Sequence, residues 1–572
     1  MCYYYSMPHL YKKTFKGRTY WYWRETHRVG GKVCVKWQKY LGSAQSIVDR
    51  LEQAQRLASP VKQHSAPFGA LFLANVLEKE LDTISIVDEV VQRAPNEKGP
   101  TVGEYFFYAW ANRMIAPQSK RALPQWYRKT AVEQIRPVAL SELSCERYWE
   151  KWNRVSEAQL ELIAKRFFNK LWSQRTEGPE SLLFDTTNYY TYMATDTKSD
   201  LAVRGHNKSG KHQLRQIGLG LLLDRQSELP LYYRVYPGNL HDSKLFHQIM
   251  DKLFSTMAGL AEGQRHLTVI FDKGMNAQDN MASIDANHQV HFLTTYSPYF
   301  AKELASLDPK HFTALEIPKN EKLRTGGQDG DQIVAYRSTL ELWGKQRTVV
   351  ITFNPATQRK KLYALQRKLD EVRCALLEYR SKYRHKERHW RSAAQIKARY
   401  RKLCETLHIS HQYYRLSFTD QTMSFRKDLS QIAYAHALMG KNIIITDNHD
   451  WSTEQIVSAS LDRYRIEKQF RASKAPHHIR INPMFHWTDG KIRCHLLTCV
   501  IALTCLRLLE LKVGAGLSGR TILEEMHSLN SVMSWLPGSR TPVVRIDDPN
   551  PIQVKILAAL GYRIENGSVL QM

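Results

Sequence analysis

Three acidic residues of this chain stand where they could hold metal ions. Asp185 follows the apolar run Leu182–Phe184, Asp272 follows the run Leu267–Phe271, and Glu467 lies in a stretch with helical spacing. Carboxylates at two strand ends and on one helix can converge on a pair of divalent cations. Such a pair clamps the attacking and leaving oxygens of a phosphoryl displacement. The pattern indicates chemistry typical of nucleases and polymerases, although a single carboxylate after an apolar run also arises by chance.

The segment around Glu467 strengthens this interpretation. A capping box at Ser452 begins a predicted helix that continues until Pro476. At about 100° per residue, Arg463, Glu467 and Lys474 project from one stripe. Apolar residues share or border this stripe instead of lying opposite it, namely Ile456, Ile466 and Phe470. The spacing favours a cleft edge over a solvated face, with Glu467 binding metal and the two cations holding phosphates.

This spacing resembles the Tyr-Arg-Glu-Lys signature of the bacterial insertion-sequence transposases that carry an Asp-Asp-Glu triad. Arg463, Glu467 and Lys474 occupy the matching positions, whereas Ser460 stands where the family has tyrosine. Tyr464 is a candidate to supply the missing contact. Further resemblance lies at Asp185-Thr186-Thr187, Gly238-Asn239 with Asp242, Asp272-Lys273-Gly274 and Arg480–Trp487.

The resemblance implies a ribonuclease-H-like catalytic domain, interrupted by an insertion domain, that acts as a homodimer or higher multimer on double-stranded DNA. Its substrates would be the terminal inverted repeats of its own element and a target DNA. Asp185, Asp272 and Glu467 would hold two Mg²⁺ or Mn²⁺ ions, which prefer oxygen ligands. We also expect DNA contacts from Arg463, Lys474, Tyr464, Arg471, Lys273 and Trp343, the last steadying a flipped base.

The charge of the chain agrees with a polyanionic partner. The 572 residues include 82 Lys and Arg against 55 Asp and Glu, a formal net charge of +27, which favours phosphate contacts. Charge alone does not separate DNA from RNA or from an anionic membrane. We find no apolar stretch long enough for a membrane span and no signal-peptide order, so we expect a cytoplasmic, nucleoid-associated protein. Cys494, Cys499 and Cys505 lie among apolar neighbours, which favours a core helix over a soft-metal site.

An α/β fold must position these residues, with a mixed sheet flanked by helices. The expected parts are an N-terminal β-hairpin module (1–45), a helical DNA-binding or dimerisation module (46–180), the first part of the catalytic domain (181–297), an insertion domain (298–440), the second part of the catalytic domain (441–512) and a C-terminal helical tail (513–572).

Several elements are predicted inside these parts. Gly30-Gly31 supplies the turn of the N-terminal hairpin, whose aromatic and basic residues either contact nucleic acid or simply stabilise the hairpin. Helices are expected over Val102–Ile115, near residues 243–257 and, in the tail, over Thr521–His527 and Pro551–Leu560. Besides the two runs that lead to the aspartates, strands are expected over Gln216–Leu223, Leu231–Tyr236 and Val290–Thr294. The insertion begins with strands at Gln332–Tyr336 and Arg347–Phe353. It continues with a basic coiled-coil seam formed by Leu362, Leu365, Leu369, Val372, Leu376, Tyr379 and Tyr383.

Two other functions remain open from the sequence. A catalytically disabled, transposase-derived protein that binds specific DNA sequences would explain the basic charge and Ser460. A structure-selective RNA nuclease on the same fold is the third alternative.

Overall fold

The computed structural model describes residues 8–29, 31–58, 60–175, 179–194, 196–205, 210, 213–240, 246, 267–286, 290–297, 302–514 and 516–572. Asp242 and, apart from Phe246, the helix expected at 243–257 lie outside these residues. The chain forms two compact units. One contains Met1–Val76, Ala122–Ser141 and Lys512–Met572, and the other contains Leu77–Arg121 and Glu142–Leu511. The expected helical module of residues 46–180 is therefore divided between the two units.

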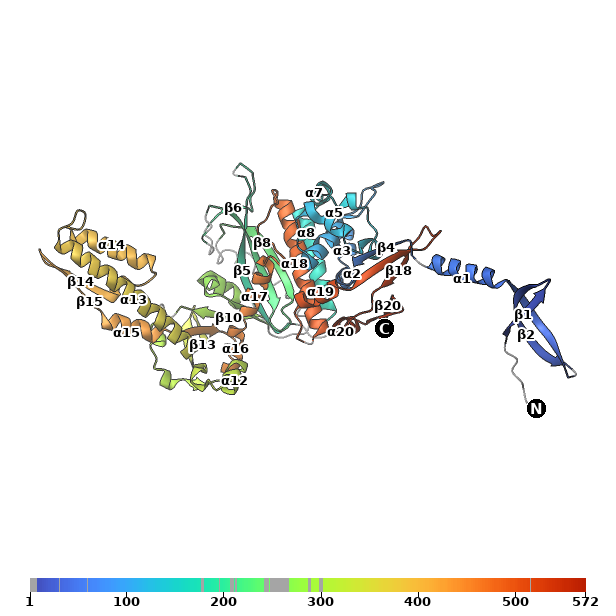
Figure 1. The fold of residues 1–572 in the computed structure, drawn as a ribbon. Coiled ribbons are helices and arrows are strands. Elements are labelled where there is room, and N and C mark those ends of the chain that lie inside the picture. The colour runs from blue at the N-terminus through green and yellow to red at the C-terminus, as the bar shows by residue number, and fades with distance from the viewer. Residues whose placement is uncertain are drawn as a thin grey trace. The chain divides into compact units, whose positions relative to one another are not determined.

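A ten-stranded mixed sheet forms the centre of the larger unit (Figure 1). Five of its strands were expected from apolar runs and are adjacent in the order β8-β7-β5-β9-β10. Strand β7 is antiparallel to both neighbours, whereas β9 is parallel to β5 and to β10. The fold class of a mixed sheet with flanking helices is thus confirmed. The five strands are β5 (Ser181–Thr191), β7 (Arg215–Asp224), β8 (Pro230–Pro237), β9 (Leu267–Phe271) and β10 (Val290–Tyr296).

The first half of the expected insertion belongs to this same sheet, which corrects the predicted boundary at residue 298. Strand β13 (Lys345–Phe353) pairs with β12 (Val334–Leu342) on one side and with β16 (Lys441–Thr446) on the other. The strands themselves were predicted correctly. Their partner was not, because the apolar run of β13 is satisfied by burial against any neighbouring strand and the sequence does not name which one. Smaller strands complete the sheet, namely β6 (Val203–Arg204) and β11 (Thr313–Ala314).

The chain leaves this sheet between two paired strands and returns after residue 440. Phe353 at the end of β13 lies opposite Lys441 at the start of β16, and the Asn354 amide donates to the Gly440 carbonyl at 2.9 Å. We call residues 354–440 the excursion. It contains α13 (Pro355–Arg384), α14 (Ala393–Thr406), β14 (Tyr414–Phe418), β15 (Met423–Lys427) and α15 (Leu429–Leu438).

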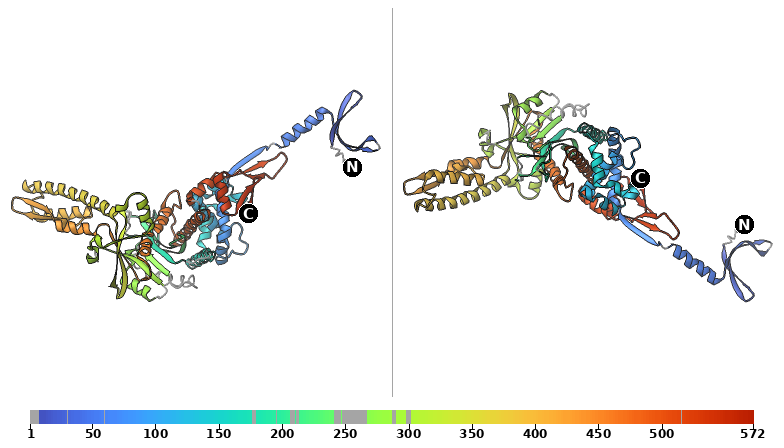
Figure 2. Two further views of the ribbon diagram at one scale, coloured as in Figure 1. Left: turned by 90° about the horizontal axis from the view of Figure 1, so that it is seen from below. Right: turned by 90° about the horizontal axis from the view of Figure 1, so that it is seen from above.

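The predicted coiled-coil seam is the buried face of α13. Leu365, Leu369, Val372 and Leu376 pack in one cluster with Ile396 of α14 and residues of the β14-β15 hairpin. Figure 2 shows α13 and α14 side by side in both views. The seam therefore closes within the chain, because the second helix and the hairpin cover it.

Helices that flank the sheet begin and end at the expected signals. Helix α4 (Val102–Ile115) starts at a capping box of Thr101 and Glu104 and matches its prediction. Cys494, Cys499 and Cys505 are buried on α18 (Asp489–Val513), as the core-helix interpretation requires. Other helices of this unit are α3 (Thr83–Val90), α7 (Cys145–Asn153), α8 (Glu157–Ser173), α10 (Gln278–Asp285), α11 (Lys302–Ala305) and α12 (Pro318–Thr325). Among the described residues, no helix is both long and apolar enough to cross a membrane.

The smaller unit contains more strand than expected. The N-terminal module is a three-stranded sheet of β1 (His9–Phe15), β2 (Arg18–Val29) and β3 (Lys32–Gly42), followed by α1 (Ala44–Ala58). Strand β4 (Lys62–Pro67), inside the module expected to be helical, pairs with β17 (Asn530–Trp535) of the tail expected to be helical. The sequence Lys-Gln-His-Ser-Ala-Pro of β4 has no apolar alternation, so its extended form depends on hydrogen bonds from β17.

The tail also carries both helices that were predicted in it. They are α19 (Gly519–His527) and α20 (Pro551–Ala559), which has a capping box at Asn550. The remaining elements of the smaller unit are α5 (Leu123–Arg128), α6 (Val132–Ile135), β18 (Val543–Ile546), β19 (Tyr562–Glu565) and β20 (Ser568–Gln571), and α2 (Gly69–Leu81) crosses the division between the units.

One lysine is buried without a hydrogen-bond partner among the described atoms. The Lys120 ammonium lies over the rings of Tyr148 and Trp152, at 5.2 and 4.9 Å from their centroids. Burial, reinforced by the charge of Arg113, lowers the pKa of Lys120 to about 7. The folded protein therefore holds this lysine partly neutral at physiological pH.

We expect Lys120→Met to stabilise the protein, most strongly at and below pH 7. The unfolded chain binds the proton up to its ordinary pKa of 10.5 and the folded chain only up to about 7. The contribution of Lys120 to stability therefore rises with pH across this window. The difference in urea midpoint between variant and wild type should shrink as pH rises from 7 to 9.5. A difference that grows with pH would contradict this assignment.

Candidate active site

Two of the three predicted carboxylates lie in the same row of the sheet. The recorded pairs of β5 and β9 advance together from Ser181 opposite Thr268 to Leu183 opposite Ile270. Two further steps along each strand reach Asp185 and Asp272. Neighbouring strands lie about 4.8 Å apart, and residues in register on parallel strands point to the same face. The register therefore places the two aspartates next to each other.

The neighbouring strand β10 extends this row. Thr294 of β10 pairs with Phe271, so the next residue, Thr295, is in register with Asp272. The Thr295 hydroxyl donates to Asp272 Oδ1 at 3.4 Å, which shows that the register continues beyond the last recorded pair. Asp185 itself accepts a hydrogen bond from the Thr186 amide at 2.8 Å.

Asp272 is held in its ionised form by two neighbours. Arg463 Nη1 lies 3.2 Å from Asp272 Oδ1, and the Lys273 amide donates to the same oxygen at 2.8 Å. Burial raises the pKa of Asp272, but the Arg463 guanidinium and the Lys273 amide together lower it more, so it lies below the usual value of an aspartate. The carboxylate is therefore charged at neutral pH.

Helix α17 (Tyr464–Lys474) connects the two strands that carry the aspartates. At its C-terminal end, Lys474 Nζ donates to Thr187 Oγ1 at 2.6 Å and Ser473 Oγ lies 2.7 Å from the Tyr189 hydroxyl. Thr187 and Tyr189 share one face of β5 with Asp185, since side chains alternate along a strand. At the other end of α17, Arg463 contacts Asp272. Glu467 lies between these two anchors.

The predicted continuous helix around Glu467 is interrupted, which corrects the single-stripe expectation. Helix α16 (Thr453–Leu461) ends before Asp462, and α17 begins after Arg463. The Asp462 carboxylate accepts from Arg465 at 3.1 Å and from Arg225 at 2.8 Å, so it anchors the turn between the helices to the β7-β8 connection. The sequence could not show this turn, because the tertiary partner Arg225 stabilises it.

A cleft of about 1210 Å³ lies between the sheet and the excursion. Asp272 and Glu467 both line it, together with Arg463. Lys361 and Lys368 of α13 line its other side, seven residues apart and therefore on one helical face. Asp272 and Glu467 lie on the sheet side, and Glu405 of α14 lies on the excursion side with these lysines. Cations on both walls beside the paired carboxylates of the sheet side suit a phosphodiester backbone with bound metal ions.

The other predicted site residues fall into two groups. Lys273 and Tyr464 line the cleft, and the Tyr464 side chain is exposed. Arg471, Lys474 and Trp343 are not among the residues that line it, and neither is the catalytic candidate Asp185. Trp343 forms the turn between β12 and β13 and packs at 6.1 Å, between ring centroids, from Phe292 and from Tyr296. It would have to leave this packing to stack on a base, so its predicted role remains a prediction.

Several lining residues were not singled out from the sequence. Thr295 and Tyr296 end strand β10 and Ser297 follows it. His408 comes from the excursion and Lys441 from β16. The end of the predicted strand at Val290–Thr294 was the available signal, because adjacent parallel strands end at the same edge of a sheet.

The oxygen donors of the predicted triad fit hard divalent ions, with two carboxylates rather than three for each ion. Asp185, Asp272 and Glu467 offer only oxygen ligands, which Mg²⁺ and Mn²⁺ prefer. Within the described part of the chain, no group of three His, Cys, Asp or Glu residues is arranged to hold one metal ion. Mg²⁺ usually takes one or two carboxylates and completes its shell with water and substrate phosphates. Pairs of carboxylates are therefore sufficient, and the DNA would complete the site.

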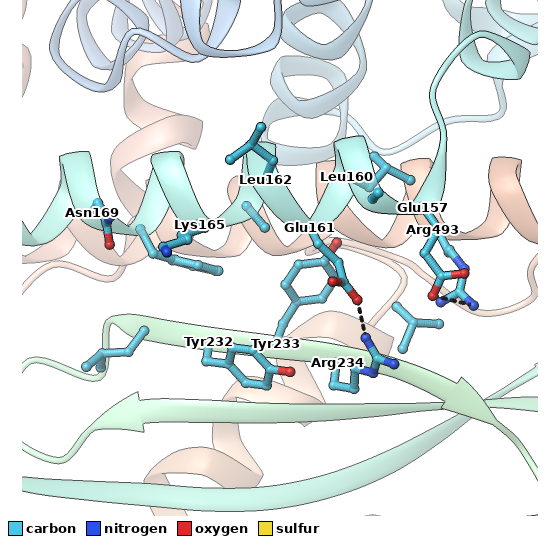
Figure 3. A pocket seen from close by; sticks show the side chains of 15 residues that line it. Glu157, Leu160, Glu161, Leu162, Lys165, Asn169, Tyr232, Tyr233, Arg234 and Arg493 are labelled. Carbon is cyan, nitrogen blue, oxygen red and sulfur yellow. Dashed lines mark hydrogen bonds and ion pairs between the residues drawn. The ribbon is translucent and has the colours of Figure 1, made fainter. Parts of the chain in front are cut away.

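A second cavity, of about 400 Å³, lies between α8 and β8 (Figure 3). Its two carboxylates are each engaged by an arginine, since Glu161 pairs with Arg234 and Glu157 lies 3.0 Å from Arg493. Both carboxylates are therefore already neutralised, and this cavity is a poorer place for a metal ion than the cleft beside Asp272.

The chain is similar to a solved structure and matches a family model. A solved structure of piggyBac transposase in a synaptic complex with hairpin DNA is similar over 81% of this chain and 82% of that chain, at 8% identity and a TM-score of 0.36. No curated protein matches the sequence. The model of the transposase DDE domain matches residues 182–505. This match spans more than half of the chain and includes Asp185, Asp272 and Glu467, so the chain belongs to the transposase DDE domain family.

Proposed function

We propose that this protein cleaves and rejoins DNA strands at the inverted-repeat ends of a bacterial insertion sequence. Asp185, Asp272 and Glu467 would hold two Mg²⁺ or Mn²⁺ ions. The observation that carries the proposal is the double anchorage of α17. It is attached beside Asp185 through Lys474 and Thr187, and to Asp272 through Arg463. The helix with Glu467 is thereby held across the two aspartates.

The fold supports the same proposal. The strand order β8-β7-β5-β9-β10, with β7 alone antiparallel, is the arrangement we infer to be ribonuclease-H-like. Asp185 lies within the central strand β5, and Asp272 directly follows the neighbouring strand β9. The excursion, which supplies the opposite wall of the cleft, would be the insertion that holds DNA against them.

Bound divalent ions would activate water and neutralise charge on the attacking and leaving oxygens. The chain's own residues would orient the DNA. Arg463 already lies beside Asp272 and can exchange this carboxylate for a phosphate oxygen, since a guanidinium binds both well. Lys361 and Lys368 would contact phosphates from the far wall of the cleft. Tyr464, the first residue of α17, would supply the contact of the tyrosine that is absent at position 460.

The test uses the purified full-length protein and the DNA that flanks its own coding region. With Mg²⁺, the wild type should cut the flanking DNA at matching inverted repeats, and with EDTA it should not. Asp185→Asn and Asp272→Asn should each abolish cutting without loss of DNA binding, because the carboxylates would act only through metal.

Asp279→Asn is the matched control for this test, because Asp279 is an exposed aspartate in the first turn of α10. It should cut like the wild type. Cutting by either catalytic-site variant at the wild-type rate would refute the proposal. Tight binding of the wild type to these ends without cutting would support the alternative, a disabled DNA-binding protein, which Ser460 in the cleft wall favours.

A further inference from the structure

The N-terminal sheet has no covered face. Among its residues whose burial is described, 9–28 and 32–42, only Gly42 is buried. Large side chains remain exposed, including Phe15 at 61%, Tyr40 at 52% and Trp23 at 39%. A small sheet usually needs a packed face to be stable. The exposed aromatic side chains therefore indicate a surface that a partner covers.

The charge of this sheet identifies the chemistry of the partner. Its single acidic residue is Glu25, against nine cations, namely Lys12, Lys13, Lys16, Arg18, Arg24, Arg28, Lys32, Lys36 and Lys39. A surface with this excess attracts a polyanion, because each phosphate contact releases a condensed counterion. A second copy of the same surface would instead be repelled.

Only one face of the sheet carries an acidic residue. The strand register places Tyr11, Tyr20, Tyr22, Tyr40, Lys13, Arg18, Arg24 and Arg28 on one face, which we call the tyrosine face. Tyr40 packs against Tyr22 at 5.2 Å, and the Arg24 guanidinium lies 3.3 Å from the centroid of Tyr11. Glu25 lies on the opposite face, where Lys36 and the Trp37 indole each donate to it at 2.8 Å. The tyrosine face is therefore cationic without an acidic residue.

The spacing of its arginines suits duplex DNA. Arg18, Arg24 and Arg28 lie along the single strand β2. At about 3.3 Å per residue they span about 33 Å, close to one turn of the double helix. Arginine and tyrosine side chains are common donors to DNA phosphates, and such contacts carry no sequence information.

We propose that the tyrosine face is a second DNA-binding surface, which grips the backbone of duplex DNA independently of the carboxylate site and of metal ions. This DNA-binding function goes beyond the proposed cleavage function, because binding at the tyrosine face does not need Asp185, Asp272 or Glu467.

The experiment measures binding of the full-length protein to a labelled random-sequence 40-bp duplex in EDTA, from 50 to 200 mM salt. Replacing Arg18, Arg24 and Arg28 together by Gln should weaken binding about 10- to 100-fold. It should also reduce the slope of log affinity against log salt by about 2 to 3, because each phosphate contact contributes about 0.9.

The matched control removes three cations from the opposite face, with Lys12, Lys32 and Lys39 replaced by Gln, and should change affinity less than about threefold. Replacing the three arginines by Lys should restore most of the affinity, because the charge remains. The Arg18→Gln and Arg28→Gln double variant keeps Arg24 on Tyr11 and should still lower the slope by about 2.

Equal losses in the two triple variants, or an unchanged salt slope, would overturn the proposal. Light scattering without DNA compares the molar mass of the wild type with that of the variant in which Arg18, Arg24 and Arg28 are replaced by Gln. A lower molar mass of the variant would also overturn the proposal, because it would show that the tyrosine face binds another protein chain. None of these outcomes depends on strand cleavage, so the two proposals can fail separately.

Discussion

Replacing Glu467 by Gln is expected to slow metal-dependent strand cleavage about a thousandfold, which corresponds to about 4 kcal/mol of transition-state stabilisation. The side chain keeps its size and its place on α17, beside the cleft that Asp272 lines. It loses the negative charge that would hold a divalent ion. Binding of terminal DNA should stay the same or become slightly tighter, since a carboxylate that repels phosphate is removed.

Glu405→Gln is the control, because Glu405 lines the same cleft from α14 and undergoes the same chemical change. Single-turnover cleavage of a labelled end fragment under saturating protein separates the chemical step from binding. Equal rates for Glu467→Gln and Glu405→Gln would show that Glu467 is an ordinary exposed residue of α17.

Replacing Asp285 by Ala is expected to destabilise the larger unit by about 3 to 5 kcal/mol. Arg347 of β13 is 2% exposed, and its Nη2 lies 2.6 Å from Asp285 Oδ2 at the end of α10. The guanidinium also lies over the Phe292 ring, at 5.1 Å. Removal of Asp285 leaves a buried charge without its carboxylate. Because α10 follows Asp272 closely in the chain, this pair also fixes the segment that begins at the active site.

Urea unfolding followed by tryptophan fluorescence would measure this loss. Asp279→Ala, at the exposed start of the same helix, should change stability by less than about 0.5 kcal/mol. Combining Asp285→Ala with Arg347→Met should recover much of the loss, since a well-packed apolar side chain often replaces a buried ion pair without penalty. If Asp285→Ala alone were as stable as the Asp279→Ala control, water would have to reach Arg347 and solvate its charge.

The strands that carry the aspartates could be predicted because each is a continuous apolar run. Leu182–Phe184 and Leu267–Phe271 need burial on both faces, which is typical of central strands. Asp272 follows the end of its strand as expected, but the expected strand end at Asp185 is wrong, because β5 continues to Thr191 through its pairing with β7. The buried face of α13 was predictable for the same reason, since its period of three and four residues matches a helix.

Partners were harder to predict than elements. Strand β4 has no apolar pattern and exists through hydrogen bonds to β17, almost the whole chain away. Strand β13 was recognised but assigned to an insertion, because its burial says nothing about which strand lies beside it. The turn at Asp462 depends on Arg225, so local spacing predicted a continuous helix there.

By itself, the sequence determined which residues are chemically suited to the site and which local elements carry them, because side-chain type and periodicity are properties of short segments. Only the tertiary structure decided that Asp185 and Asp272 are in register, that Arg463 rather than Lys474 lies on Asp272, and that α13 forms the far wall of the cleft. Contacts between distant segments depend on the simultaneous packing of the whole sheet, which no local pattern contains.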